Sequence, residues 1–334
     1  MYKWNKQEIN LLINYLISLE HNLEEIEDDI ELLYMLKRRD DKKGSLRQTI
    51  KYNLEEENDD YKELITYDNI LFPLIDKYSE DNIPLPHYKK IKLSKNDILT
   101  FTRDNIKNIN PKWLNELDKY FNFKNIDFQK NNPNCAVYLS YLNRVFVSLN
   151  KENTIADFYN PTHELLHVYY FLKNPKVYNH IENEFLSILG ELITSYEMYN
   201  NNLFKEEVLK NNVESYYIFL DYLKSIILKR ITIINNVESK NKINYLKNKL
   251  LISKQLIKSI YTTSLDYNYK YVISYVLALE LFKLYLIDKE KCMYITEKLI
   301  LSNDEFEKKL KDNNINLLEN SDEYIKQLKK NIDF

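Results

Sequence analysis

The sequence has few of the residues that form tight turns and cross-links. Its 334 residues include 2 Gly, 2 Cys and 7 Pro. Folds built on many tight turns, or on glycine-rich loops around phosphates, need more glycine, so we expect long helices joined by polar loops. Two cysteines far apart in the sequence, Cys135 and Cys292, cannot form a disulfide framework. They favour a reducing, cytoplasmic location.

The sequence also lacks long apolar runs and a strong net charge. Residues 1–8 contain no apolar run typical of a signal peptide, and no uncharged apolar run reaches 18 residues. The net charge is −3, which creates no basic field to attract nucleic acid or anionic membranes. Apolar residues make up 44% and charged residues 29%, as in folded soluble proteins. We therefore expect neither nucleic acid nor a membrane as a partner.

Helical spacing of apolar residues dominates most of the chain, and one segment departs from it. Residues 136–142 and 145–149 are rich in β-branched and aromatic side chains, and Asn143-Arg144 separates them. This pattern predicts a β-hairpin. The sequence thus predicts a mainly α fold in two parts, an N-terminal helical region over residues 1–125 and a second region over residues 126–334.

The segment that follows the hairpin carries a metal-binding pattern. Asn160 and Pro161 suit the cap and first position of a helix, and Asn174 marks its end. His163 and His167 are four residues apart, so both imidazoles project from one helix face, about 6 Å apart, as two ligands of Zn²⁺ require.

Glu164 lies beside the first histidine, where it can take a proton from water at the metal. With 5 His and 50 acidic residues in the chain, chance alone predicts about 0.01 such motifs. The alternative is an ordinary surface helix that happens to carry two histidines.

A catalytic zinc usually needs a third protein ligand, and the next predicted helix, which begins near Tyr178, offers several carboxylates. Glu184, Ser187 and Glu191 have the spacing of one helix face. Glu184 is the predicted ligand, with Glu182 and Glu191 as alternatives. Ser187 and Glu191 could hold the ligands in place by hydrogen bonds.

These motifs resemble the oligoendopeptidase F and thimet oligopeptidase family. The matching residues are Asp157, the helix from His163 to His167, the pattern from Glu184 through Ser187 to Glu191, and Tyr196. The resemblance implies a helical metallopeptidase of the zincin fold, gluzincin type, with a small β-hairpin or sheet edge beside the zinc helix. It also implies one Zn²⁺, with Glu184 as third ligand and Glu164 as general base.

Two further segments are similar to the family. Residues 267–278 resemble its tyrosine-bearing helix, which implies that Tyr271 or Tyr275 hydrogen-bonds the scissile carbonyl. The strand 144–150 is similar to the strand before the family's zinc helix, which implies that it binds substrate backbone as an edge strand.

The sequence departs from the family in four respects. Leu166 replaces the glycine that normally precedes the second histidine, and the interval between His167 and Glu184 is several residues shorter. No histidine follows His180, so the family's downstream active-site histidine has no counterpart. The chain is also much shorter, and the resemblance covers roughly residues 133–290.

The sequence therefore predicts a zinc-dependent endopeptidase or oligopeptidase that acts on short, unfolded peptides. The alternative is a catalytically weak protein of the zincin fold that binds a peptide or a protein partner. The missing histidine and Leu166 favour the alternative, whereas an intact Glu164 favours the enzyme.

Overall fold

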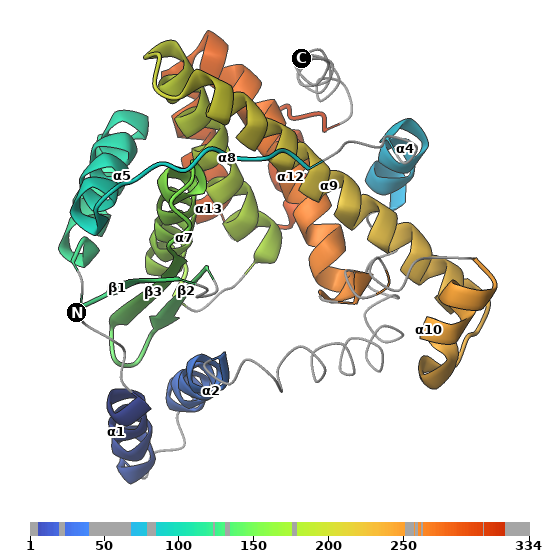
Figure 1. Ribbon diagram of the computed structural model, residues 1–334, viewed down its shortest axis with the longest axis horizontal. Coiled ribbons are helices and arrows are strands. Elements are labelled where there is room, and N and C mark those ends of the chain that lie inside the picture. Colours follow the sequence, from blue (N-terminus) through green and yellow to red (C-terminus); the bar gives the residue numbers. More distant parts are fainter. Residues whose placement is uncertain are drawn as a thin grey trace.

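Helices make up most of the computed structural model (Figure 1). It describes residues 6–19, 24–39, 68–78, 85–122, 124–130, 134–175, 179–250, 257, 260–261, 263–302 and 304–317. None of the helices in these ranges is long and apolar enough to cross a membrane. The mainly α fold predicted from the sequence is confirmed.

Most of the described part of residues 1–125 is helical, although residues 85–94 form no helix. The helices of this part are α1 (Lys6–Ser18), α2 (Glu24–Arg39), α4 (Asp68–Tyr78), α5 (Lys95–Ile109) and α6 (Pro111–Leu117). Helix α5 begins at a capping box, because Ser94 Oγ accepts a hydrogen bond from Asp97 N and the Asp97 carboxylate accepts one from Ser94 N.

A three-stranded sheet follows these helices. It consists of β1 (Ile126–Gln129), β2 (Cys135–Leu139) and β3 (Arg144–Asn150), in the order β1-β3-β2. Strands β2 and β3 form the predicted antiparallel hairpin, and Asn143 takes the left-handed conformation in its turn, with φ of 44°. Strand β1, which the sequence did not reveal, pairs with β3 in parallel.

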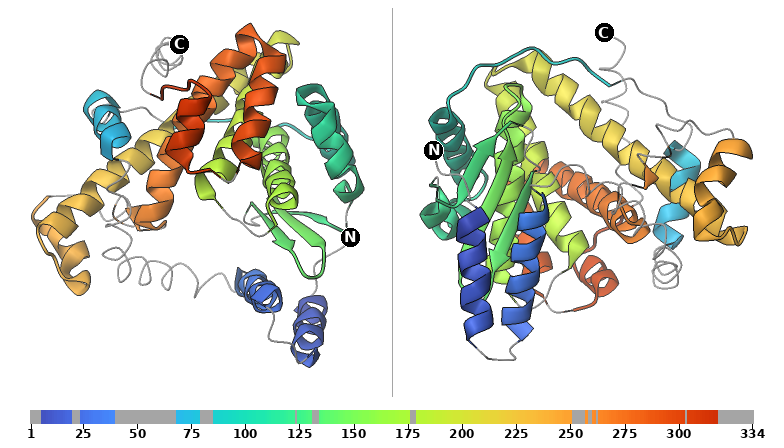
Figure 2. Two further views of the ribbon diagram at one scale, coloured as in Figure 1. Left: turned by 180° about the vertical axis from the view of Figure 1, so that it is seen from behind. Right: turned by 60° about the horizontal axis from the view of Figure 1, so that its bottom comes forward.

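Helices α1 and α2 pack on this sheet and share a small core with it. The two helices lie alongside the strands in the right-hand view of Figure 2. The buried apolar side chains of this core come from α1, α2, β2 and β3: Ile9, Ile13, Leu16, Ile26, Leu33, Val137, Leu139 and Phe146. The N-terminal helices and the strands that precede the metal-binding motif are thus joined by packing. The boundary near residue 125 stays a prediction.

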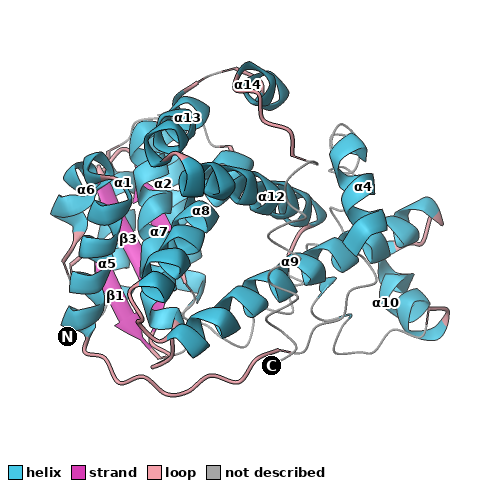
Figure 3. Ribbon diagram, turned by 90° about the horizontal axis from the view of Figure 1, so that it is seen from above, coloured by secondary structure: helices cyan, strands magenta, loops and turns pink. Residues whose placement is uncertain are grey.

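The remaining described helices form a bundle, of which α7 packs against the sheet. They are α7 (Ala156–Lys173), α8 (His180–Asn200), α9 (Lys205–Ile234), α10 (Ser239–Asn248), α12 (Leu265–Ile287), α13 (Lys289–Leu301) and α14 (Phe306–Asp312). Helix α7 packs on β2 and β3, and α8 packs on both α7 and α12 (Figures 1 and 3). The two helices that carry the predicted ligands are therefore neighbours at the centre of the bundle.

The start of α7 differs from the prediction. The helix begins at Ala156, and Pro161 lies inside it. The turn before the helix is already organised upstream, because the buried Asp157 carboxylate accepts hydrogen bonds from the amides of Glu152 and Asn153. Pro161 removes one intrahelical hydrogen bond without ending the helix. The predicted end is confirmed, since Asn174 is the C-cap.

Candidate metal centre

Helices α7 and α8 bring three metal-ligating side chains to one point. Ligand atoms of His163, His167 and Glu184 all lie within 4.8 Å of one another. The Nε2 atom of His163 is 3.8 Å from Glu184 Oε2, and that of His167 is 3.9 Å from Glu184 Oε1. The two imidazole planes are nearly perpendicular, at 87°, with centroids 4.6 Å apart. All three predicted ligands are thus adjacent.

The side of each imidazole that faces away from Glu184 has a polar neighbour. His167 Nδ1 is 2.9 Å from Asn183 Oδ1 and 3.0 Å from Ser187 Oγ. Ser187 Oγ donates its hydrogen to the carbonyl of His163 at 2.9 Å, so it accepts from the His167 ring. This arrangement places the His167 proton on Nδ1 and directs the lone pair of Nε2 toward Glu184.

On the corresponding side of His163, Glu191 makes an ion-pair contact whose geometry is not that of a hydrogen bond. The Nδ1 atom of His163 lies 3.0 Å from Glu191 Oε1, which favours a proton on that nitrogen as well. The sequence pointed to Ser187 and Glu191 as supporting groups, but it did not single out Asn183. The available signal was spacing, because Asn183 precedes Ser187 by four residues and shares its helix face.

The donor set fits a divalent cation. Glu184 Oε2 is buried and accepts no hydrogen bond from the residues that the structure describes, although Oε1 accepts one from Tyr267 Oη at 3.4 Å. Two imidazoles and one carboxylate are ligands that Zn²⁺ takes, and tetrahedral bonds of ~2.1 Å separate ligand atoms by roughly 3.4 Å. The contacts at 3.8 and 3.9 Å are slightly wider than that spacing.

The electrostatics of the site also favour a cation. Burial lowers the pKa of His163, but the carboxylates of Glu191, Glu164 and Glu184 outweigh it and raise the pKa to about 9. Burial and the charge of His163 hold the pKa of His167 well below its usual value. Burial raises the pKa of Glu184, and His163 opposes that rise. A cation at this point would offset the negative charge of the carboxylates.

The two alternative carboxylates occupy other positions. Glu182 is buried away from the imidazoles, in an ion pair with Lys309. Glu191 lies at the Nδ1 side of His163. Of the three acidic candidates on α8, Glu184 is the one that faces both Nε2 atoms.

The packing of α7 on α8 explains how the helix accommodates Leu166. Both Leu166 and Gly190 are buried, and a Cβ atom on Gly190 would lie 2.2 Å from Leu166 Cδ1. Gly190 therefore supplies the space that Leu166 fills. The bulky residue before His167 is compatible with a close approach of the two ligand-bearing helices.

A cluster of tyrosines from α9 and α12 lies next to Glu184. Tyr267 hydrogen-bonds Glu184, and the ring centroid of Tyr222 is 5.8 Å from that of Tyr267 and 4.5 Å from that of Tyr271. Burial, followed by the charge of Glu191, raises the pKa of Tyr271 well above its usual value. Tyr275 is 1% exposed and stacks on Phe219. Tyr267, which the sequence did not single out, donates a hydrogen bond to the candidate ligand Glu184.

The strand predicted to receive substrate occupies a different place in the sheet. Strand β3 pairs with β2 over residues 144–148 and with β1 over residues 147–150, so it is the central strand. The implied edge position of β3 is therefore wrong. The sheet edges belong to β1 and β2, because β1 adds a third strand that the hairpin pattern did not predict.

Comparison with solved structures identifies the fold. The chain is similar to a protein assigned as an oligoendopeptidase F (TM-score 0.56, 12% identity, covering 86% of this chain and 57% of that one). It is also similar to one with the same assignment from Bacillus anthracis (TM-score 0.54, 13% identity, 97% and 58%) and to PZ peptidase A with an inhibitor (0.52, 12%, 86% and 57%). The predicted zincin fold is confirmed.

The chain spans a little over half the length of these structures. No protein-family model and no curated protein matches the sequence.

Proposed function

We propose that the protein is a zinc-dependent peptidase in which His163, His167 and Glu184 hold one metal ion. The observation that carries the proposal is the convergence of these three side chains, buried or nearly so, on one point of a fold similar to that of oligopeptidases. The endopeptidase or oligopeptidase activity and the use of zinc itself are parts of this proposal, as is a cytoplasmic location.

The residues around the site have distinct tasks in the proposed reaction. Zinc would supply Lewis acidity toward the peptide carbonyl and lower the pKa of a water molecule in the site. Glu164, buried next to His163, accepts the water proton and passes it to the leaving amine. Asn183, Ser187 and Glu191 orient the imidazoles. A hydroxyl of the tyrosine helix, from Tyr271 or Tyr275, donates to the developing oxyanion.

The substrate would be an extended peptide bound along the sheet. Because β3 is paired on both sides, the edge that can accept another strand beside α7 is that of β2 (Cys135–Leu139). Side chains of such a peptide would point alternately to the two faces of the sheet, one set toward the face on which α7 packs and the other away from it.

A second candidate function is peptide or protein binding with little catalysis. This function is favoured by the lack of a counterpart to the family's downstream active-site histidine, because the chain contains no histidine after His180. The metal-binding geometry is the same for both functions, so only turnover separates them.

The decisive experiment has two measurements. The metal content of protein purified without added zinc should be one zinc per chain, and a peptide library should be cleaved by this protein but spared when a chelator is present. Stoichiometric zinc without peptide cleavage would contradict the peptidase function and favour the binding function. Protein that neither retains nor takes up zinc would overturn both.

A further inference from the structure

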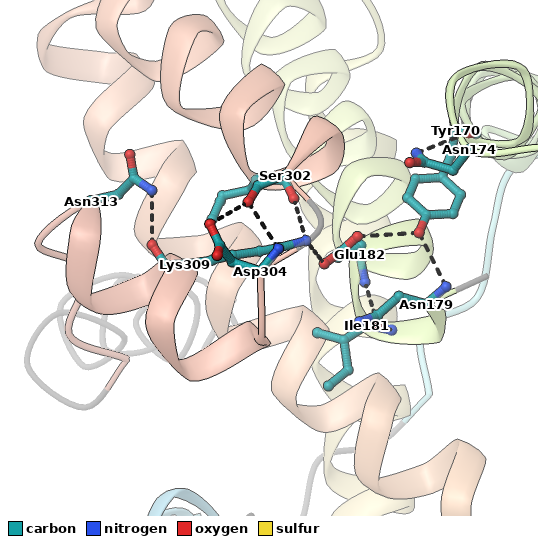
Figure 4. Close-up of polar contacts among 10 residues, drawn as sticks. Tyr170, Asn174, Asn179, Ile181, Glu182, Ser302, Asp304, Lys309 and Asn313 are labelled. Carbon is teal, nitrogen blue, oxygen red and sulfur yellow. Dashed lines mark hydrogen bonds and ion pairs between the residues drawn. The ribbon is translucent and has the colours of Figure 1, made fainter. Parts of the chain in front are cut away.

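A buried polar network lies at the first turn of α8 (Figure 4). Glu182 and Lys309 form an ion pair in which each residue is 4% exposed. Lys309 Nζ also donates to the carbonyl of Leu299, at 3.0 Å. Lys309 belongs to α14 and Leu299 to the last turn of α13, so the network ties the C-terminal helices to α8.

The same network reaches the end of α7 through Tyr170. The Tyr170 hydroxyl is 3.2 Å from Glu182 Oε2, to which it donates, and it accepts a hydrogen bond from Asn179 N at 3.1 Å. Asn179 is the N-cap of α8, and its side chain accepts from the amides of Ile181 and Glu182. Tyr170 therefore connects the last turns of one ligand-bearing helix to the first turn of the other.

The position of this network relates it to the ligands. Tyr170 lies three residues after His167, and Glu182 lies two residues before Glu184. Because a helix moves as a rigid element, a displacement of either end changes the separation between His167 and Glu184. A buried ion pair adds little net stability, since desolvation offsets its attraction, so a role in fixing geometry is the better explanation for its presence.

We propose that Lys309, acting through Glu182 and Tyr170, is a positioning residue that sets the spacing of α7 and α8 and thereby the metal affinity of the site. The inference rests on the proposed function, because it concerns the ligands His163, His167 and Glu184. It assigns the C-terminal helix α14 a part in metal binding although it contributes no ligand.

The test is the zinc affinity of the folded, full-length chain, measured by competition with a chromophoric chelator. Lys309→Met should weaken zinc binding by about 10–100-fold, the range typical when groups that orient ligands are lost. Lys309→Arg should restore part of this loss. Lys308→Met is the matched control, because Lys308 is the adjacent residue on α14 and its side chain is exposed; its zinc affinity should equal that of wild type.

A second variant distinguishes a loss of zinc affinity from a loss of folding. Lys309→Met leaves a buried charge without its partner, whereas Lys309→Met combined with Glu182→Leu replaces the pair by apolar groups, which proteins often tolerate. The double variant should remain folded and bind zinc about tenfold or more weakly.

Wild-type zinc affinity in the folded double variant, or equal losses in Lys308→Met and Lys309→Met, would overturn the positioning role alone. A wild-type protein that binds no zinc would instead overturn the proposed function and, with it, the positioning role.

Discussion

Glu164 and Glu184 are both buried carboxylates near His163, and their positions on the helices separate their roles. Glu184 faces the two Nε2 atoms from a neighbouring helix, whereas Glu164 follows His163 on the same helix and is rotated about 100° from it. A third ligand must direct an oxygen at the metal from a coordination position of its own, whereas a general base must lie beside the metal, within reach of the water there. Changing each carboxylate should therefore affect a different measurement.

Glu164→Gln should retain zinc and lose peptidase activity. The amide keeps the shape of the side chain but cannot accept a proton, so kcat should fall at least about 10²–10⁴-fold. Metal content and the rate of peptide cleavage should be measured on the same preparation. Glu184→Gln serves as the contrasting variant, because its loss should appear first in zinc content. Cleavage by Glu164→Gln at the wild-type rate would refute the mechanism.

Tyr271 and Tyr275 differ in their surroundings, which makes them a matched pair. Tyr271 lies in the tyrosine cluster beside Glu184 and Glu191, whereas Tyr275 stacks on Phe219 and is 1% exposed. If Tyr271 donates to the oxyanion, Tyr271→Phe should lower kcat about 10²–10³-fold with unchanged zinc content.

Tyr275→Phe should change kcat much less than Tyr271→Phe does, because the ring of Tyr275 is buried against Phe219 and the substitution preserves that ring. Steady-state kinetics of both variants beside wild type would decide the matter. If neither substitution altered kcat, this helix would have only a packing role.

At the scale of elements, the interface between α7 and α8 determines whether the ligands can meet. Gly190 and Leu166 are complementary in this interface, because the missing Cβ of the glycine leaves room for the leucine. Their effects on stability should therefore be coupled, and a double-mutant cycle measures such coupling.

Gly190→Ala should destabilise the protein in the wild-type background and stabilise it when Leu166 is also changed to Ala. Overpacking costs about 1–3 kcal/mol and opposes the roughly 1 kcal/mol that Ala gains over Gly within a helix. With Leu166→Ala the overlap is gone and only the gain remains. Denaturant unfolding of the four proteins in the cycle tests this change of sign. The same sign in both backgrounds would show that the two residues do not compete for space.

Sequence patterns predicted those elements whose signal is local. The ligand face of α7 followed from the spacing of His163 and His167, and the hairpin followed from its β-branched strands. The predicted start of α7 was wrong. Asn160 and Pro161 look like a helix start, but the helix begins at Ala156, after a turn that Asp157 stabilises by accepting two backbone hydrogen bonds. Strand β1 has four residues and pairs with a strand about 20 positions later, so no local pattern marked it.

In the candidate site, too, the sequence predicted the residues whose signal is local. Periodicity placed Glu184 on one helix face with Ser187 and Glu191, and the family resemblance favoured it as ligand over Glu182 and Glu191. Tyr267 and Lys309 could not be predicted, because their contacts depend on how α12 and α14 pack against α8. Side chains that approach a site from distant segments leave no local pattern in a single sequence.

At the scale of the whole molecule, the candidate metal centre lies where the helical bundle and the sheet meet. Helix α7 packs on β2 and β3 on one side and on α8 on the other, and α8 packs on α12. The candidate ligands His163, His167 and Glu184 therefore join elements that contribute many of the buried apolar side chains of the largest hydrophobic cluster. A metal ion at this point should stabilise the folded chain as a whole.

Removal of the metal should lower the melting temperature, and added zinc should restore it. A ligand that binds only the folded state adds about 2.7 kcal/mol of stability when its free concentration is 100 times Kd. Without the ion, Glu184, Glu191 and Glu164 remain close together near His163, and relief of the repulsion among these carboxylates is part of the free energy that metal binding supplies. We expect a decrease of several degrees in thermal unfolding followed by circular dichroism after chelation. His163→Ala is the control, because it lacks a ligand and its melting temperature should not respond to zinc. An equal response in His163→Ala and wild type would mean that zinc stabilises the protein from another site.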